Sequence, residues 1–176
     1  MSTSDTLPTL LAAALDVNAR LRALEPGTHA NTRPRTANTE ATLRTYETET
    51  GEALPPGFRD FLLAADGWKA CYFGMGLFGL PELRGGGNWA EGQELLRMYE
   101  DEEVLENIGI DPANVMPVAA GQRLNLIVIH RSATATPGRV VWIDAGEALG
   151  RFEDFRACIE RIVAVKRRHL DRVAAQ

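Results

Sequence analysis

The stretch GEALPPGFRDFLLAADGW, Gly51–Trp68, contains the signals of a complete helix and of both its boundaries. Gly51 can end a preceding helix, because glycine takes the left-handed backbone of a helix C-terminus without steric cost. Pro55 and Pro56 can start the next helix, since the first N–H groups of a helix have no intrahelical partner. Asp66-Gly67 then predicts a closing turn. Apolar residues at three- and four-residue spacing predict one buried face: Phe58, Phe61, Leu62 and Ala65.

The chain before this stretch predicts an N-terminal amphipathic helix, a linker and a short helix that Asn38 or Thr39 caps and Gly51 ends. Apolar residues keep helical spacing over Leu7–Leu24, Thr6 is a candidate N-cap, and Pro26-Gly27 is a stop signal. We therefore expect an N-terminal amphipathic helix within residues 1–27. Residues 28–38, rich in Thr, Asn, Arg and Pro, predict a loop or linker, and residues 39–176 predict the main domain.

The chain after this stretch alternates between strand and helix patterns. Cys71–Phe78 predicts a strand, and Trp89–Leu105 predicts an acidic helix. Three Val- and Ile-rich segments predict strands: Val115–Ala119, Leu124–His130 and Arg139–Asp144. Their short connections predict antiparallel pairing. A closing helix is expected from about Phe152. This order predicts an α+β single domain, with a mainly antiparallel sheet of about four to six strands flanked by helices and an extra N-terminal helix.

Length and composition indicate how many domains the chain forms and which cellular compartment it suits. The 176 residues fit one domain, and 45% hydrophobic content supports a core. No apolar run reaches the length of a membrane helix, so we expect no membrane partner. The N-terminus lacks the basic start of a secretory signal. Two distant cysteines, Cys71 and Cys158, do not form a disulfide framework, which favours a reduced cytoplasmic setting.

Charge is unevenly distributed along the chain, whose net charge is −5. Residues 82–111 hold nine acids and two bases, so this segment alone is −7 and the remainder sums to +2. An acidic surface attracts basic proteins and repels nucleic acid. The basic tract 166–169 complements the carbonyl end of a helix dipole, and no aromatic stacking pattern accompanies it. We therefore expect no nucleic-acid partner.

Catalytic and metal-binding patterns are missing from the sequence. No serine lies in a Gly-x-Ser-x-Gly elbow, and both cysteines fit a core better than a nucleophile. The triple glycine 85–87 lacks the Lys-Ser/Thr of a phosphate loop and favours a flexible hinge or binding loop. The histidines His29, His130 and His169 are scattered, without the i, i+4 spacing of a zinc helix. We expect no enzyme activity, no cofactor and no metal site.

The chain resembles the SUKH superfamily (Smi/Knr-like proteins) over roughly residues 39–165. The likeness begins with the acidic helix, the Leu54-Pro55-Pro56 step, the aromatic and the polar-Gly turn. Four later elements fit its order and spacing: Met116-Pro117-Val118-Ala119-Ala120-Gly121, Leu124–Ile129, Gly138-Arg139-Val140-Val141-Trp142 and Phe152-Glu153-Asp154-Phe155. The N-terminal helix lies outside the likeness.

The resemblance implies a function through protein binding. Many bacterial members of the superfamily are thought to be immunity proteins that neutralise a toxin, and nuclease toxins are commonly basic. We therefore expect a non-enzymatic immunity protein whose partner is a cognate protein toxin. The candidate partner-binding residues combine large aromatics and acids: Trp68, Glu82, Trp89, Glu91, Glu94, Asp101, Glu102 and Glu103.

Several alternatives stay open at this stage. One alternative is that the acids form only a soluble face and that Trp68 or Trp89 fills the end of a core. A second alternative, implied by the fungal members of the superfamily, is a regulatory or scaffolding module that binds endogenous partners through the helix at Leu7–Leu24. A small enzyme with an unfamiliar site, using for instance Glu82, Asp101 or His130, is the third alternative.

Overall fold

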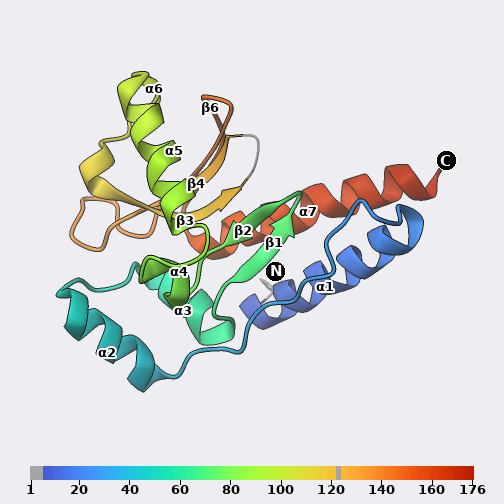
Figure 1. The fold of residues 1–176 in the computed structure, drawn as a ribbon, viewed down its shortest axis with the longest axis horizontal. Helices are drawn as coiled ribbons and strands as arrows, with labels where there is room; N and C mark the ends of the chain where they lie inside the picture. The colour runs from blue at the N-terminus through green and yellow to red at the C-terminus, as the bar shows by residue number, and fades with distance from the viewer. Residues whose placement is uncertain (1–5, 122–123) are drawn as a thin grey trace, which may run out of the picture.

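The computed structural model describes residues 6–121 and 124–176 (Figure 1). Within these ranges the chain forms seven α-helices, a 3-10 turn and six strands. The helices are α1 (Leu7–Leu24), α2 (Glu40–Thr50), α3 (Pro56–Ala64), α4 (Leu80–Leu83), α5 (Trp89–Asp101), α6 (Val104–Asn107) and α7 (Phe155–Ala174), and the 3-10 turn is η1 (Pro112–Asn114). The strands are β1 (Trp68–Tyr72), β2 (Met75–Leu77), β3 (Val115–Gly121), β4 (Asn125–His130), β5 (Val140–Asp144) and β6 (Glu147–Phe152).

The six strands form one antiparallel sheet in the order β1-β2-β3-β4-β5-β6. Each strand therefore pairs with its neighbour in sequence. The short connections predicted this antiparallel pairing for β3, β4 and β5, whereas α4, α5 and α6 lie between β2 and β3. The α+β class and the antiparallel sheet flanked by helices are confirmed. No helix in the described ranges is both long and apolar enough to cross a membrane.

Helices cover both faces of the sheet. One apolar cluster joins inward residues of α1, α2, α3 and α7 to one face, and a second cluster joins α5 and α6 to the other. Figure 1 shows α5 and α6 on the side of the sheet away from α1 and α7. The central strands are buried on both faces, which explains their nearly continuous Val, Ile and Ala runs.

The stretch 51–68 forms the structure that its pattern predicted. Gly51 ends α2 with a left-handed φ of 68°, and α3 begins directly after Pro55. Phe58 and Phe61 are fully buried, and their ring centroids lie 5.1 and 5.0 Å from that of Phe155. This aromatic trio packs α3 against the start of α7.

The N-terminal helix is part of the same core. Thr6 caps α1 by accepting the Thr9 N–H, as predicted, and α1 and α7 lie side by side in Figure 1. The buried ammonium of Lys166 on α7 donates to the Asn18 side-chain oxygen on α1 and to the Cys71 carbonyl on β1. Burial lowers the pKa of Lys166. Most apolar residues of α1 are buried against the domain, whereas Leu24 at its end is 48% exposed.

Residues 28–38 are pinned to the domain. The Arg35 N–H donates to the Gly67 carbonyl at 3.0 Å, and the Asp66 N–H donates to the Arg35 carbonyl at 3.3 Å. The Asn38 N–H donates to the Leu62 carbonyl at 2.9 Å. These bonds hold the segment against α3 and the turn that follows it, so it is an extended strap rather than a free linker.

Three elements differ from the sequence-based expectations. The predicted strand Cys71–Phe78 is a hairpin, because Phe73 and Gly74 turn the chain with φ of 40° and 89°. The predicted helix Trp89–Leu105 breaks at Glu103, whose φ is 58°. Phe152 belongs to the unexpected strand β6 instead of the closing helix, which begins at Phe155 after the N-cap Asp154.

Candidate functional site

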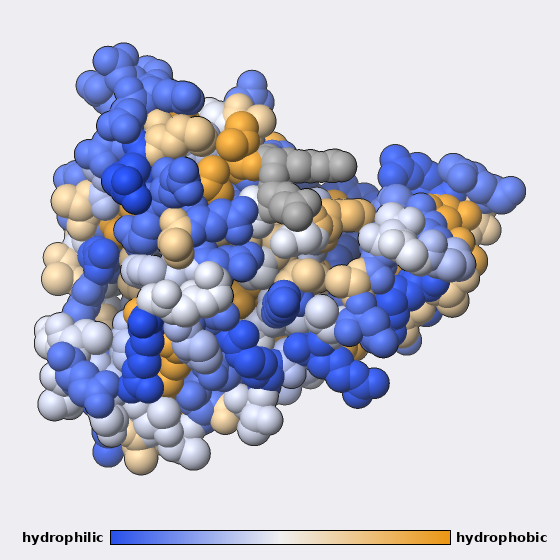
Figure 2. Space-filling view, in the orientation of Figure 1, coloured by the Kyte–Doolittle hydropathy of each residue, from blue (hydrophilic) through white to orange (hydrophobic). Residues whose placement is uncertain are grey.

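Five acids on α5 and in the two residues that follow it form what we call the acidic surface: Glu91, Glu94, Asp101, Glu102 and Glu103. Glu94 and Asp101 lie seven residues apart, nearly two helical turns, and therefore share the outward face of α5. Glu91 is half-buried and the other four residues are exposed. Figure 2 shows hydrophilic residues gathered at the upper left, over α5 and α6.

The sequence of α5 explains why these acids point outward. The apolar residues of the helix lie on its opposite side, where Leu95, Leu96 and Tyr99 are buried against the sheet. The Tyr99 hydroxyl donates to the Leu124 carbonyl at 2.5 Å, and this fixes α5 to the start of β4. The Leu124 side chain itself is 42% accessible.

The carboxylates of the acidic surface are available for a partner. No ion pair between described residues includes any of the five acids. Asp101, Glu102 and Glu103 lie at the carbonyl end of α5, where negative charge opposes the helix dipole by ~0.3–1 kcal/mol per group. Their position therefore lowers the stability of the helix, which favours a role in binding over one in folding.

Trp89 is separated from the acidic surface. Its ring is half-buried, packs against both apolar clusters and lies 6.1 Å from the Phe78 ring between centroids. Trp89 also lines a hollow of about 160 Å³ together with Tyr46, Leu54 and Arg131. The acids project from the other side of α5, so the structure does not bring the predicted aromatic anchor and the acids together.

Trp68 and Glu82 are interior residues, which corrects their assignment to a partner-binding surface. Trp68 is 1% exposed, and its Nε1–H donates to the Thr32 hydroxyl at 3.1 Å. Glu82 is 9% exposed and accepts the Gly79 N–H at 2.7 Å. For Trp68, the alternative that it plugs the end of a core is confirmed.

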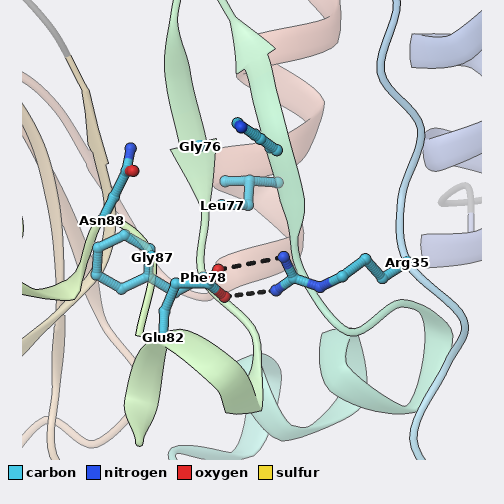
Figure 3. A pocket seen from close by; sticks show the side chains of 8 residues that line it. Arg35, Gly76, Leu77, Phe78, Glu82, Gly87 and Asn88 are labelled. Carbon is cyan, nitrogen blue, oxygen red and sulfur yellow. Dashed lines mark hydrogen bonds and ion pairs between the residues drawn. The ribbon is translucent and has the colours of Figure 1, made fainter. Parts of the chain in front are cut away.

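Glu82 instead holds the strap of residues 28–38 in place (Figure 3). Both carboxylate oxygens accept from the Arg35 guanidinium, at 2.5 and 3.1 Å, and the Arg35 Nε–H donates to the Asp66 carbonyl at 2.6 Å. Arg35 and Glu82 border a hollow of about 130 Å³. A Cβ at Gly87 would lie 2.7 Å from a Glu82 oxygen, so Gly87 packs closely over this carboxylate.

The two cysteines are unsuited to nucleophilic chemistry. Both are buried, and burial raises the pKa of Cys71 to about 11 and the pKa of Cys158 further. Since the thiolate is the nucleophile, only roughly 0.1% of Cys71 is reactive at pH 8. Folding thus keeps both thiols protonated, and the stability that this contributes is present below the unfolded thiol pKa and is lost as the pH rises through the folded value.

We predict that an aromatic disulfide reagent at pH 8 labels both thiols quickly when the protein is denatured. Over the same time it should label neither thiol of the native protein. Absorbance of the released thiolate measures the rate. Rapid native labelling of Cys71 or Cys158 would contradict the burial of both groups.

Two of the three histidines, His29 and His169, lie together in the structure, so the prediction that all three are scattered is wrong. His29 and His169 both bond the Glu25 carboxylate, 2.7 and 2.8 Å from the same oxygen, and these imidazoles hold the pKa of Glu25 below its usual value. The i, i+4 spacing of Glu25 and His29 was visible in the sequence, whereas His169 lies 144 residues from Glu25. His130 stands apart, and its Nδ1 pairs with the Thr136 hydroxyl.

No protein-family model and no curated protein matches the chain.

Proposed function

We propose that this protein is a non-enzymatic, cytoplasmic immunity protein that binds a basic protein toxin through the acidic surface and occludes it. The observation that carries the proposal is the set of outward-facing carboxylates on α5, which have no cationic partner among the described residues and include three acids at the unfavourable end of the helix dipole. The SUKH-like motifs support the same function. The mechanism is stoichiometric binding and needs no cofactor.

The charges would act mainly on the speed and selectivity of association. Exposed carboxylates steer a basic partner toward the surface and reject acidic proteins, while they add little to affinity individually. Because solvent-exposed charges are screened within about 8 Å at physiological salt, the association rate should fall steeply as salt is raised.

The test begins with a search for a toxin-like gene beside the gene of this protein, whose absence would contradict the proposal, and continues with co-expression of the two genes. We expect the wild-type protein to relieve the growth arrest that this toxin causes, and Asp101→Lys/Glu102→Lys to weaken the complex by ~10-fold or more, chiefly through the association rate. The matched control is Asp60→Lys/Asp171→Lys, which makes the same charge change at exposed positions outside the acidic surface. Surface plasmon resonance measures both rate constants.

Each outcome is informative. Equal binding by the two double variants would place the interface elsewhere, and the lack of any complex with the neighbouring toxin would end the immunity proposal. A pull-down that returns endogenous housekeeping proteins and no toxin would favour the regulatory or scaffolding alternative. Trp89→Ala is unsuitable as a binding test, because the ring packs against both apolar clusters and its loss would also reduce stability.

A further inference from the structure

A second cluster of polar side chains lies between the ends of α1 and α7, outside the acidic surface. Glu25 is the C-cap of α1, His29 follows in the next turn, and His169 projects from α7. The two imidazole Nε2 atoms and one oxygen of Glu25 lie within 4.8 Å of one another, and all three residues are half-buried.

We propose that Glu25, His29 and His169 bind a divalent transition metal, with zinc as the best fit. Two imidazole nitrogens and one carboxylate oxygen form a ligand set that zinc takes with a fourth position left for water or another ligand. Calcium and magnesium prefer oxygen ligands and are therefore disfavoured. This proposal is independent of toxin binding.

The distances between the Glu25 oxygen and the two imidazole nitrogens are slightly shorter than those between ligand atoms of a tetrahedral zinc site. Zinc bonds of ~2.0–2.2 Å place neighbouring ligand atoms of a tetrahedral site ~3.3 Å apart. The Glu25 oxygen lies 2.7 Å from His29 Nε2 and 2.8 Å from His169 Nε2. The ligands must therefore separate by about half an ångström, which a rotation of the Glu25 side chain at the end of its helix can supply.

The surrounding structure holds the ligands together before any ion binds. Val17, Leu21 and Leu170 form a small apolar cluster that packs α1 against α7 one turn before the site. Phe73 covers the pair of imidazoles, with its ring centroid 5.7 Å from that of His29 and 5.5 Å from that of His169. Phe73 is 46% exposed and has a φ of 40°. An exposed aromatic residue in this strained backbone region is a feature that clusters at functional sites.

Arg172 opposes metal binding and so provides a sharp test. Its guanidinium donates to His169 Nδ1 at 2.6 Å. A neutral imidazole that binds metal through Nε2 must carry its proton on Nδ1 and donate it, so Arg172 has to move away. Arg172 is exposed and free to do so, but its charge and that of Arg168 lower the affinity.

The two arginines also suggest which fourth ligand the metal accepts. A hollow of about 480 Å³ lies on the His169 side of Phe73, and its lining includes Tyr72, Arg168 and Arg172. A water or small anion bound to the metal from this hollow would lie beside two guanidinium groups, which favours an anionic ligand.

The experiment titrates the chelator-treated full chain with zinc by calorimetry and with cobalt(II) by visible spectroscopy. We expect one ion per chain and the intense visible bands of tetrahedral cobalt. His169→Ala and His29→Ala should each weaken binding by ~100-fold or more, since even outer partners of metal ligands contribute ~10–100-fold. His130→Ala is the matched control, because His130 lies outside the cluster, and it should bind as the wild type does.

Arg172→Gln should tighten zinc binding by ~10-fold, because it removes a cation and offers an oxygen that accepts the Nδ1 proton. This variant keeps all three ligands, so it decides the question even if a histidine variant fails to fold. The proposal is overturned if the wild type binds no zinc, if His29→Ala and His169→Ala bind as tightly as His130→Ala, or if Arg172→Gln binds no better than the wild type.

Discussion

Phe155→Ala is expected to lower the free energy of unfolding by ~3–5 kcal/mol. The Phe155 ring is fully buried and lies 5.1 and 5.0 Å from the rings of Phe58 and Phe61, between centroids, so truncation leaves a cavity where α3 meets α7. A domain of this kind has a total stability of about 5–15 kcal/mol, so the loss is a large share of it. Urea denaturation followed by circular dichroism measures the change.

The control for this prediction is the same substitution at a surface position. Phe73 is 46% exposed on the turn between β1 and β2, and Phe73→Ala should cost ~1 kcal/mol or less, since it removes less buried area. Equal losses for the two variants would show that the Phe58–Phe61–Phe155 trio does not anchor the fold.

Arg35→Ala is expected to lower the free energy of unfolding by ~2–3 kcal/mol. Removing one partner of a buried ion pair costs ~3–5 kcal/mol, and the 36% exposure of the Arg35 side chain reduces this figure because solvent screens the charge. The variant leaves the Glu82 carboxylate, 12% exposed, without its cation and the Asp66 carbonyl without its donor. Urea denaturation again measures the effect.

Two further variants separate the charge from other effects of the substitution. Arg84→Ala removes an exposed pair with Glu49, in which both side chains are at least half exposed, and should cost less than ~0.5 kcal/mol. Adding Glu82→Gln to Arg35→Ala removes the unpaired charge and should restore part of the loss. If Arg35→Ala costs no more than Arg84→Ala, the pair does not hold the strap.

Local signals in the sequence predicted most of the helices. Capping residues such as Thr6 and Thr39, and the stop at Gly51, act through bonds within a few residues and are therefore visible in the sequence. The order of β3, β4 and β5 followed from their short connections, whereas the pairing of β2 with β3 spans α4, α5 and α6. The strand β6 was missed because Glu147, Ala148 and Leu149 are all exposed, so no alternation of apolar and polar residues marks it.

The candidate site was predicted only in part, because burial and partners depend on distant residues. The acidity of α5 is a property of composition, and its outward direction follows from helical spacing. Glu82 belonged to the same acidic segment, but in the structure it is buried and paired with Arg35. Because Arg35 lies 47 residues away, the sequence did not reveal this pair. The meeting of His29 and His169 depends in the same way on how α1 packs against α7.

The pairing of α1 with α7 closes a far longer loop than any strand pair of the sheet. Four of the five strand connections are short, whereas α4, α5, α6 and η1 lie between β2 and β3. By contrast, the bond between Lys166 and Asn18 joins residues 148 apart. Closing a loop of that length costs ~3 kcal/mol more than closing one of five residues. The strands β3 to β6 can therefore assemble step by step from hairpins, whereas the contact between α1 and α7 needs a closure of nearly the whole chain length.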